Sequence, residues 1–310
     1  MIIAVRDSDD NYRQGAAMTA LLAGITAIGK SKKTIAIQLT GFTQDSIMDI
    51  LYGKAIKGNA IRDIYSFTDD GLDGLLLRAE TADLTKEHYD ECVTPLLQKE
   101  NMFDVIKPTS KPNIMDIIEG DVIENVVKNA ESVYDYVYLF LPNDDAKLYE
   151  EVTKYTDKEL VLVPQGIQKQ IDISNGKTHI VVKDFEESSK FDVSYIRKQY
   201  NVKTLYTLPY NVGYRDAVIS ENLLDFILVN RNDIKNDDNY SFSSSLWNMI
   251  SKFVAKDEED DDDDTEKFTN KQAQEYLTVE EQTELPETAI QQVKVKKGLF
   301  RKKDEFIVNM

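Results

Sequence analysis

Seven short runs of β-branched and aromatic residues, separated by amphipathic stretches, dominate the first 256 residues of the sequence. Several of these runs are continuously apolar and do not alternate with polar residues, which is typical of strands buried on both faces of a parallel sheet. The expected strands are 2–5, 34–39, 103–106, 136–141, 160–163, 179–182 and 204–208. Strand–helix alternation over this length predicts a doubly wound α/β fold, with a mostly parallel sheet and helices on both faces.

Helical periodicity fills the stretches between the expected strands. The expected helices are 19–28, 122–133, 144–156, 191–200 and 214–229, and Gly29 is placed to end the first of them. A last apolar stripe over 242–254 contains the sole tryptophan, Trp247. This stripe predicts either a helix that packs on the sheet or a helix that lies on a membrane surface.

Composition limits the classes of function. The chain has 37 basic and 55 acidic residues and a formal net charge of −18, which argues against broad nucleic-acid binding. Cys92 is the only cysteine, so an intrachain disulfide and a cysteine zinc site are excluded, and only 2 histidines are present. The sequence contains no apolar run of about 18 residues and no basic leader, which predicts a cytoplasmic protein.

Eight consecutive acidic residues at 257–264 mark the expected domain boundary. Such a run repels itself and cannot enter a packed core. We therefore expect a globular domain over 1–256, an acidic linker over 257–266, and a flexible, largely disordered tail over 267–310. The run is either a solvated spacer or a binding site for a basic partner or a metal.

The segment 134–142 reads Tyr-Asp-Tyr-Val-Tyr-Leu-Phe-Leu-Pro. It resembles a strand that ends in Asp-x-Pro in the MinD/ParA family of deviant Walker A P-loop ATPases. Segments 160–164 and 207–211 resemble their next strand and a late loop, and the stretch from 71–76 through 106–108 is similar to the pilus- and secretion-associated members TadZ and CpaE. The resemblance covers 1–256 and implies a P-loop NTPase-like fold.

The loop after the first expected strand departs from the family's phosphate-binding motif. That motif works because glycines let backbone amides close around phosphate oxygens, while a lysine and a threonine hold the phosphate and Mg²⁺. If Thr19 matches the family's last threonine, the site is degenerate at nearly every position. Asn11 replaces the signature lysine, Tyr12 and Arg13 replace paired glycines, Gly15 is retained, Ala16 replaces the P-loop lysine, and Ala17 replaces the magnesium-binding threonine.

Charge in this loop also opposes phosphate. The loop carries Asp7, Asp9 and Asp10. Opposite unit charges about 4 Å apart attract by roughly 4 kcal/mol at an effective dielectric near 20, so loss of the lysine and gain of acids both lower the affinity for phosphate. Arg6 and Arg13 leave weak nucleotide binding without turnover as an open alternative.

The metal-binding positions are altered as well. Where the family has an Asp-x-Asp after its second strand, this chain has Gln38 and Thr40, and Phe140 aligns with the Walker B-type aspartate. A register shift that brings Asp144 or Asp145 near would restore a metal site. Together, these losses predict a pseudo-ATPase with no bound cofactor or metal.

Basic and apolar residues cluster near the end of the tail. The candidate motif comprises Lys296, Lys297, Leu299, Phe300, Arg301 and Lys302, and it resembles the membrane-targeting tails of MinD-type proteins. Asp304 and Glu305 oppose lipid binding, so docking on a partner protein, membrane contact and a plain disordered tail all remain open.

The resemblance implies a non-catalytic scaffold that localises or recruits a membrane-associated pilus, secretion or conjugation assembly at the inner face of the membrane. We expect a monomer or a nucleotide-independent dimer whose partner interface includes Asp9, Asp10, Tyr12 and Arg13. The alternative is a ParA-type ATPase with a rewired site that acts in DNA or plasmid segregation. A DNA-binding partition factor without turnover is a third reading, which the acidic charge disfavours.

Overall fold

One mixed sheet organises the part of the chain that the computed structural model describes. The described residues are 1–9, 11–40, 46–57, 70–97, 103–109, 111, 114–142, 145–166, 170–171, 173, 176–202, 204–230 and 237–254. Within these residues, eight strands lie in the order β3-β4-β2-β5-β1-β6-β7-β8, and every pair is parallel except β3 with β4. The strands are β1 (Ile2–Asp7), β2 (Thr34–Gln38), β3 (Val93–Leu97), β4 (Phe103–Ile106), β5 (Tyr136–Phe140), β6 (Lys158–Pro164), β7 (Thr178–Phe185) and β8 (Leu205–Pro209).

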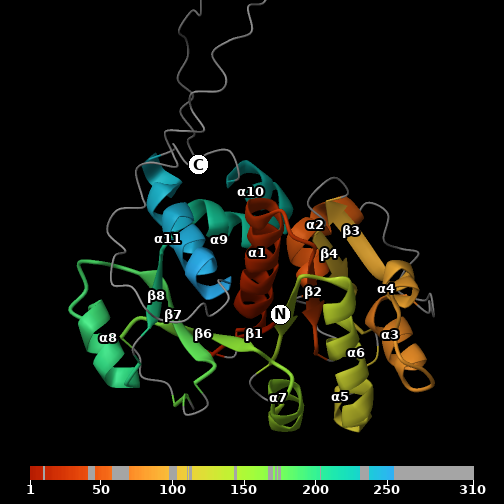
Figure 1. Ribbon diagram of the computed structural model, residues 1–310. Helices are drawn as coiled ribbons and strands as arrows, with labels where there is room; N and C mark the ends of the chain where they lie inside the picture. Colours follow the sequence, from red (N-terminus) through yellow and green to blue (C-terminus); the bar gives the residue numbers. More distant parts are fainter. Residues whose placement is uncertain are drawn as a thin grey trace, which may run out of the picture. The chain divides into compact units, whose positions relative to one another are not determined.

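Helices cover both faces of this sheet (Figure 1). One face carries α1 (Tyr12–Lys30), α2 (Ile47–Lys57), α9 (Val212–Ile219), α10 (Leu223–Asn230) and α11 (Asp237–Val254), whose apolar side chains share one core cluster. The other face carries α3 (Gly71–Ala79), α4 (Lys86–Cys92), α5 (Ile114–Ile117), α6 (Gly120–Val133), α7 (Ala146–Thr153) and α8 (Val193–Tyr200). The doubly wound α/β architecture expected from the sequence is confirmed.

The seven expected strands are all present, and the sequence analysis missed one. β3 is an outer strand that pairs antiparallel with β4 and contains Pro95, with an irregular register between Pro95 and Leu97. Proline cannot donate a ladder hydrogen bond, so it is confined to edge strands and bulges. The pattern Val-Thr-Pro-Leu-Leu therefore did not read as a strand.

Three expected helix boundaries were wrong. The first helix begins at Tyr12, not near residue 19, and runs past Gly29 to end at Lys30, with Ser31 in the left-handed conformation. The helix expected over 214–229 is two helices, α9 and α10, because the chain turns between them with Glu221 at φ 56°. The last helix extends back to Asp237.

The apolar stripe of α11 belongs to the core. Phe242, Leu246, Met249, Ile250, Phe253 and Val254 are all buried. Packing on the sheet is therefore the correct reading for these six residues, and their side chains are not free to lie on a membrane. Helices long and apolar enough to cross a membrane are absent from the described residues.

The chain changes direction at the centre of the sheet. β1 leads through α1 to β2 on one side, whereas β5 leads through α7 to β6 on the other side. Ligands of open α/β sheets bind outside the carboxyl ends of the strands at such a switch point. A ligand site is therefore expected at the ends of β1 and β5, near Asp7 and Phe140.

Candidate functional site

The connection from β1 to α1 is short. β1 ends at Asp7, and Asn11 caps α1 by accepting a hydrogen bond from the Gln14 amide at 3.1 Å. The phosphate-binding loop expected over residues 7–19 is therefore corrected: from Tyr12 onward this stretch is helix. A good N-cap followed by helix formers such as Ala16 and Ala17 starts the helix early, and a single glycine does not prevent it.

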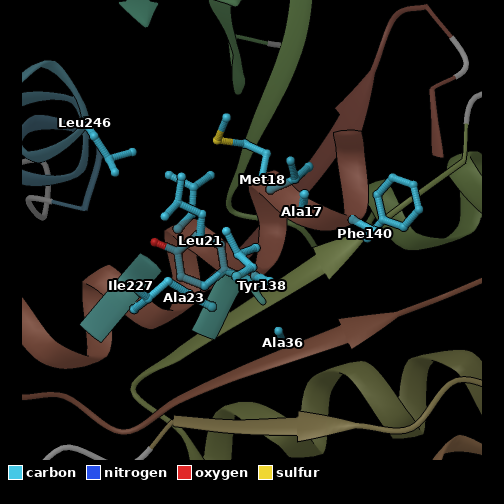
Figure 2. Packing of buried hydrophobic residues seen from close by; sticks show 14 of the residues in the cluster. Ala17, Met18, Leu21, Ala23, Ala36, Tyr138, Phe140, Ile227 and Leu246 are labelled. Carbon is cyan, nitrogen blue, oxygen red and sulfur yellow. The ribbon is translucent and has the colours of Figure 1, made fainter. Parts of the chain in front are cut away.

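Phe140 occupies the space beside the first turns of α1. It ends β5, pairs with Val5 of β1, and is 1% exposed. A Cβ atom on Gly15 would lie 2.3 Å from Cε2 of Phe140, so the ring rests directly on the glycine backbone. Tyr12 meets the same ring edge to face, with 6.1 Å between ring centroids. Figure 2 shows Phe140 beside the stretch of α1 that carries Ala17 and Met18.

Gly15, Ala16 and Ala17 are thereby explained as packing residues. Ala16 and Ala17 are fully buried within α1. Gly15, the one glycine of the expected motif that the sequence retains, lies where an aromatic ring approaches the helix backbone. The close approach accounts for the glycine without a bound phosphate.

Lys183 forms the electrostatic centre of this edge. Its ammonium group lies 2.8 and 2.7 Å from the two carboxylate oxygens of Asp7 and 3.1 Å from Oδ2 of Asp9. Asp7 and Lys183 are both largely buried, with 2% and 14% of their side chains exposed. Burial raises the pKa of Asp7 above its ordinary value, and the hydrogen bond and charge of Lys183 pull it back down.

Strand geometry delivers Lys183 to this place. It lies near the end of β7, two strands from β1, and alternation puts it on the face of Val181 and Asp7. The next residue, Asp184, has φ 51°, and the register of β7 with β8 shifts between Val182 and Phe185. The sequence analysis missed Lys183; its signal was a lysine directly after the buried run 180–182.

Tyr214 of α9 borders the same cluster. Burial raises the pKa of its hydroxyl, and the charges of Asp184 and Asp7 add to the effect. Its ring stacks on Phe242 at 5.5 Å. Among the described residues, its Oη is a buried oxygen without a hydrogen-bond partner in the protein, an arrangement that an ordered water normally satisfies.

Gln38 and Thr40, at the end of β2, hold the start of α2. The Gln38 carboxamide donates to Oγ1 of Thr40 at 3.0 Å and accepts from the Ile47 amide at 2.8 Å. Both side chains are buried. At the Asp-x-Asp positions expected from the family resemblance, the chain thus has a helix-capping pair.

Solved structures of known proteins match the fold of this chain. A ParA family ATPase from Chlorobium tepidum has 12% identity and a TM-score of 0.59, over 79% of this chain and 98% of that chain. The MinD cell division ATPase of Pyrococcus furiosus has 12% identity and a TM-score of 0.54, over 82% and 99%. MinD in the MinC:MinD cell division complex of Aquifex aeolicus has 15% identity and a TM-score of 0.53, over 81% and 96%.

The fold is that of the ParA and MinD ATPases. No protein-family model and no curated protein sequence matches the chain. At 12–15% identity, the likeness to ParA and MinD establishes the fold alone.

The two arginines near the ParA/MinD nucleotide position are engaged within the protein. Arg6 pairs with Glu159 at 2.6 Å and stacks 4.5 Å from the Tyr149 ring centroid, on the sheet face opposite α1. Arg13 donates to the Val218 carbonyl at 2.8 Å, at the end of α9. Part of the donor set of each guanidinium is therefore already used within the protein.

The expected partner residues are partly placed. Asp9 is 29% exposed and paired with Lys183, whereas Tyr12 and Arg13 are half-buried. Asp10 lies outside the described residues, as do the acidic linker and the tail motif at 296–302. Asp144 is also outside, but Asp145 caps α7 by accepting from the Leu148 amide at 2.8 Å.

Metal ligands are not assembled in the described part of the chain, where no group of three or more His, Cys, Asp or Glu side chains is placed to hold an ion. Asp7 and Asp9 already share the Lys183 ammonium. A divalent cation at the end of β1 would have to displace that lysine.

Proposed function

We propose that this protein is a non-catalytic scaffold of the ParA/MinD fold, which recruits a membrane-associated assembly through protein contacts. The observation that carries the proposal is Phe140. An apolar ring fills the space beside Gly15, at the position where the resemblance to active family members puts a metal-binding carboxylate. A magnesium-bound triphosphate needs charge and backbone amides at that place, and a phenyl ring offers neither.

The charge balance supports the same conclusion. Lys183 is a cation at the end of β1, but Asp7 and Asp9 both contact its ammonium group. The triad carries a net charge of −1 when both acids are ionised. A phosphate would have to compete with two tethered carboxylates for one ammonium.

A scaffold role agrees with what the fold supports elsewhere. The Aquifex MinD was solved as a complex with MinC, so a protein of this architecture can hold a protein partner. We propose a pilus, secretion or conjugation assembly as the machine served. The partner surface would include Asp9 and Asp10, together with Tyr12 and Arg13 of the first turn of α1.

Isothermal titration of the full chain with ATP and Mg²⁺, together with a phosphate-release assay, tests the proposal. We expect no binding heat at millimolar ATP and no phosphate release, with an active ParA ATPase as the positive control. A micromolar dissociation constant with turnover would overturn it and favour the rewired ATPase.

The partner surface has its own test. Asp9→Asn with Asp10→Asn removes the charge without placing a cation against Lys183, and it should weaken cross-linking to the recruited assembly. Asp83→Asn with Asp121→Asn is the matched control, since both residues are exposed acids elsewhere. Equal cross-linking by the two variants would contradict the assigned surface.

A further inference from the structure

Two stretches of the chain that lack acidic residues contain helices that end at the amino-terminal edge of the sheet. Although 55 of 310 residues are acidic, residues 11–44 and 239–256 contain no Asp or Glu. These stretches include α1 and most of α11, which pack against each other. In parallel α/β folds the helices run antiparallel to the strands, so both end at the amino edge.

Trp247 marks this edge. A Cβ atom on Gly29, near the end of α1, would lie 2.0 Å from Cζ3 of the indole, so the six-membered ring packs directly against that glycine. The Lys30 ammonium stands 5.6 Å from the ring centroid. The indole nevertheless remains 38% exposed, although the other face of α11 is buried in the core.

Lysines continue the edge on both sides of the indole. Lys32 and Lys252 are exposed, and Lys158 donates to the Phe253 carbonyl at 2.9 Å, at the end of α11. Among the described residues, the lysines of this basic edge are Lys30, Lys32, Lys33, Lys158, Lys177 and Lys252, and the nearby carboxylates are Asp104, Glu131, Asp135 and Asp157. Within this described set, the cations outnumber the anions.

Helix capping explains only part of this pattern. Lys30 and Lys158 lie at the carbonyl ends of α1 and α11, where a positive charge is favourable. That effect does not account for the exposure of Trp247, which lies earlier in α11 and beside Lys30. An exposed indole beside lysines with long apolar stems is the combination that bilayer interfaces favour.

We propose that this basic edge docks on an anionic lipid bilayer, with Trp247 at the headgroup level and Lys30, Lys32 and Lys252 against the headgroups. The contact does not depend on the state of the nucleotide position, which lies at the opposite edge of the sheet. The acidic run at 257–264 starts three residues after α11 ends and opposes the attraction. Binding is therefore expected to be reversible and salt-sensitive.

The sole tryptophan makes the contact directly measurable in the full chain. Vesicles of phosphatidylglycerol in phosphatidylcholine should shift the Trp247 emission to the blue, and vesicles of phosphatidylcholine alone should not. Brominated lipid chains in the anionic vesicles should quench the emission. Co-sedimentation without a shift or quenching would overturn the proposal, because another part of the chain would then hold the lipid.

Two double variants distinguish the effect of lysines at this edge from the effect of the protein's net charge. Lys30→Gln with Lys32→Gln should weaken vesicle binding about five-fold per lysine, about twenty-five-fold together. Lys128→Gln with Lys154→Gln makes the same change in net charge at exposed helix lysines that pair with Glu124 and Glu151, and should change binding less than two-fold. Equal weakening by both pairs would overturn the proposal.

Two further measurements exclude the rival contacts. Neutralising Lys296, Lys297, Arg301 and Lys302 to Gln tests the tail; abolished Trp247 quenching in that variant would assign the lipid contact to the tail. Poly-glutamate serves as a soluble acidic probe. If it shifts the Trp247 emission and anionic vesicles do not, the basic edge takes an acidic polypeptide and the lipid proposal fails.

Discussion

The two ends of the central sheet differ in what they leave open to other molecules. At the carboxyl ends of the strands, Phe140 packs on Gly15 and Lys183 is paired with Asp7, so aromatic and ionic groups satisfy one another inside the protein. At the amino ends, Trp247 and Lys252 face solvent. Among the described residues, the end at which α/β proteins usually bind ligands carries groups paired with one another (the closed end), and the opposite end presents an indole and lysines to solvent (the exposed end).

This difference separates two kinds of position: those whose side chains pack within the protein and those whose side chains face solvent. Each altered position at the carboxyl end has a packing or capping role: Ala16 and Ala17 are buried, and Gln38 holds the start of α2. Substitutions at the closed end should therefore act mainly on stability. Substitutions at the exposed end should act mainly on binding.

The largest effect on stability is expected from Phe140→Ala. Removing a buried phenyl ring leaves a cavity and typically costs about 3–5 kcal/mol of unfolding free energy. Urea denaturation followed by circular dichroism measures it. A loss of less than about 1 kcal/mol of unfolding free energy would contradict tight packing of the Phe140 ring against Gly15. Gain of ATP binding in this variant would show that the ring alone excludes nucleotide.

Lys183→Met should follow. This substitution leaves Asp7 and Asp9 without their shared cation. Breaking a buried ion pair by removing one partner costs about 3 kcal/mol of unfolding free energy at the lower end of the usual range. The lower end applies because the Lys183 side chain is 14% exposed. Urea denaturation at pH 7 should report this loss. Lys128→Met, which breaks an exposed pair with Glu124, is the control and should change stability by less than about 0.5 kcal/mol.

The pH dependence of this variant has a definite sign. The pKa of Asp7 in the folded protein lies above its unfolded value, so its contribution to stability is full below pH 3.8 and is lost as the pH rises through the folded pKa. Without Lys183 that pKa rises further. The stability difference between the wild type and Lys183→Met should therefore narrow from pH 7 to pH 4. A constant difference would contradict the ion-pair reading.

Gly15→Ala should have a smaller effect. The new methyl group would meet Phe140 within 2.3 Å, and overpacking of this kind costs about 1–3 kcal/mol. The cost should shrink in a Phe140→Leu background, because the shorter side chain withdraws from the glycine. Independent, additive effects in the double-mutant cycle would argue against direct contact.

Trp247→Ala should have the smallest effect on stability, about 1–2 kcal/mol, since the indole is partly exposed. Its effect on anionic vesicle binding should be much larger than that of Phe140→Ala. Vesicle flotation of both variants measures this contrast. If the two variants lose vesicle binding to the same extent, the division of roles between the two ends of the sheet is wrong.

Much of this fold was predictable from sequence because parallel strands buried on both faces read as continuous apolar runs. The early start of α1 was not, because residues 7–19 were interpreted as a phosphate-binding loop and Asn11 was not considered as an N-cap. Phe140 was singled out from the sequence as a position of the nucleotide site, but its contact with Gly15 depends on pairing between β1 and β5. Lys183 reaches Asp7 from two strands away, and no local pattern carries that information.

The outer strand β3 has a consequence for how densely such a protein can gather. Pro95 has no amide hydrogen, and the irregular register after it interrupts the row of groups that a neighbouring chain would extend. This border of the sheet is therefore a poor template for edge-to-edge growth. A second copy of the chain would gain few regular backbone hydrogen bonds by pairing along β3.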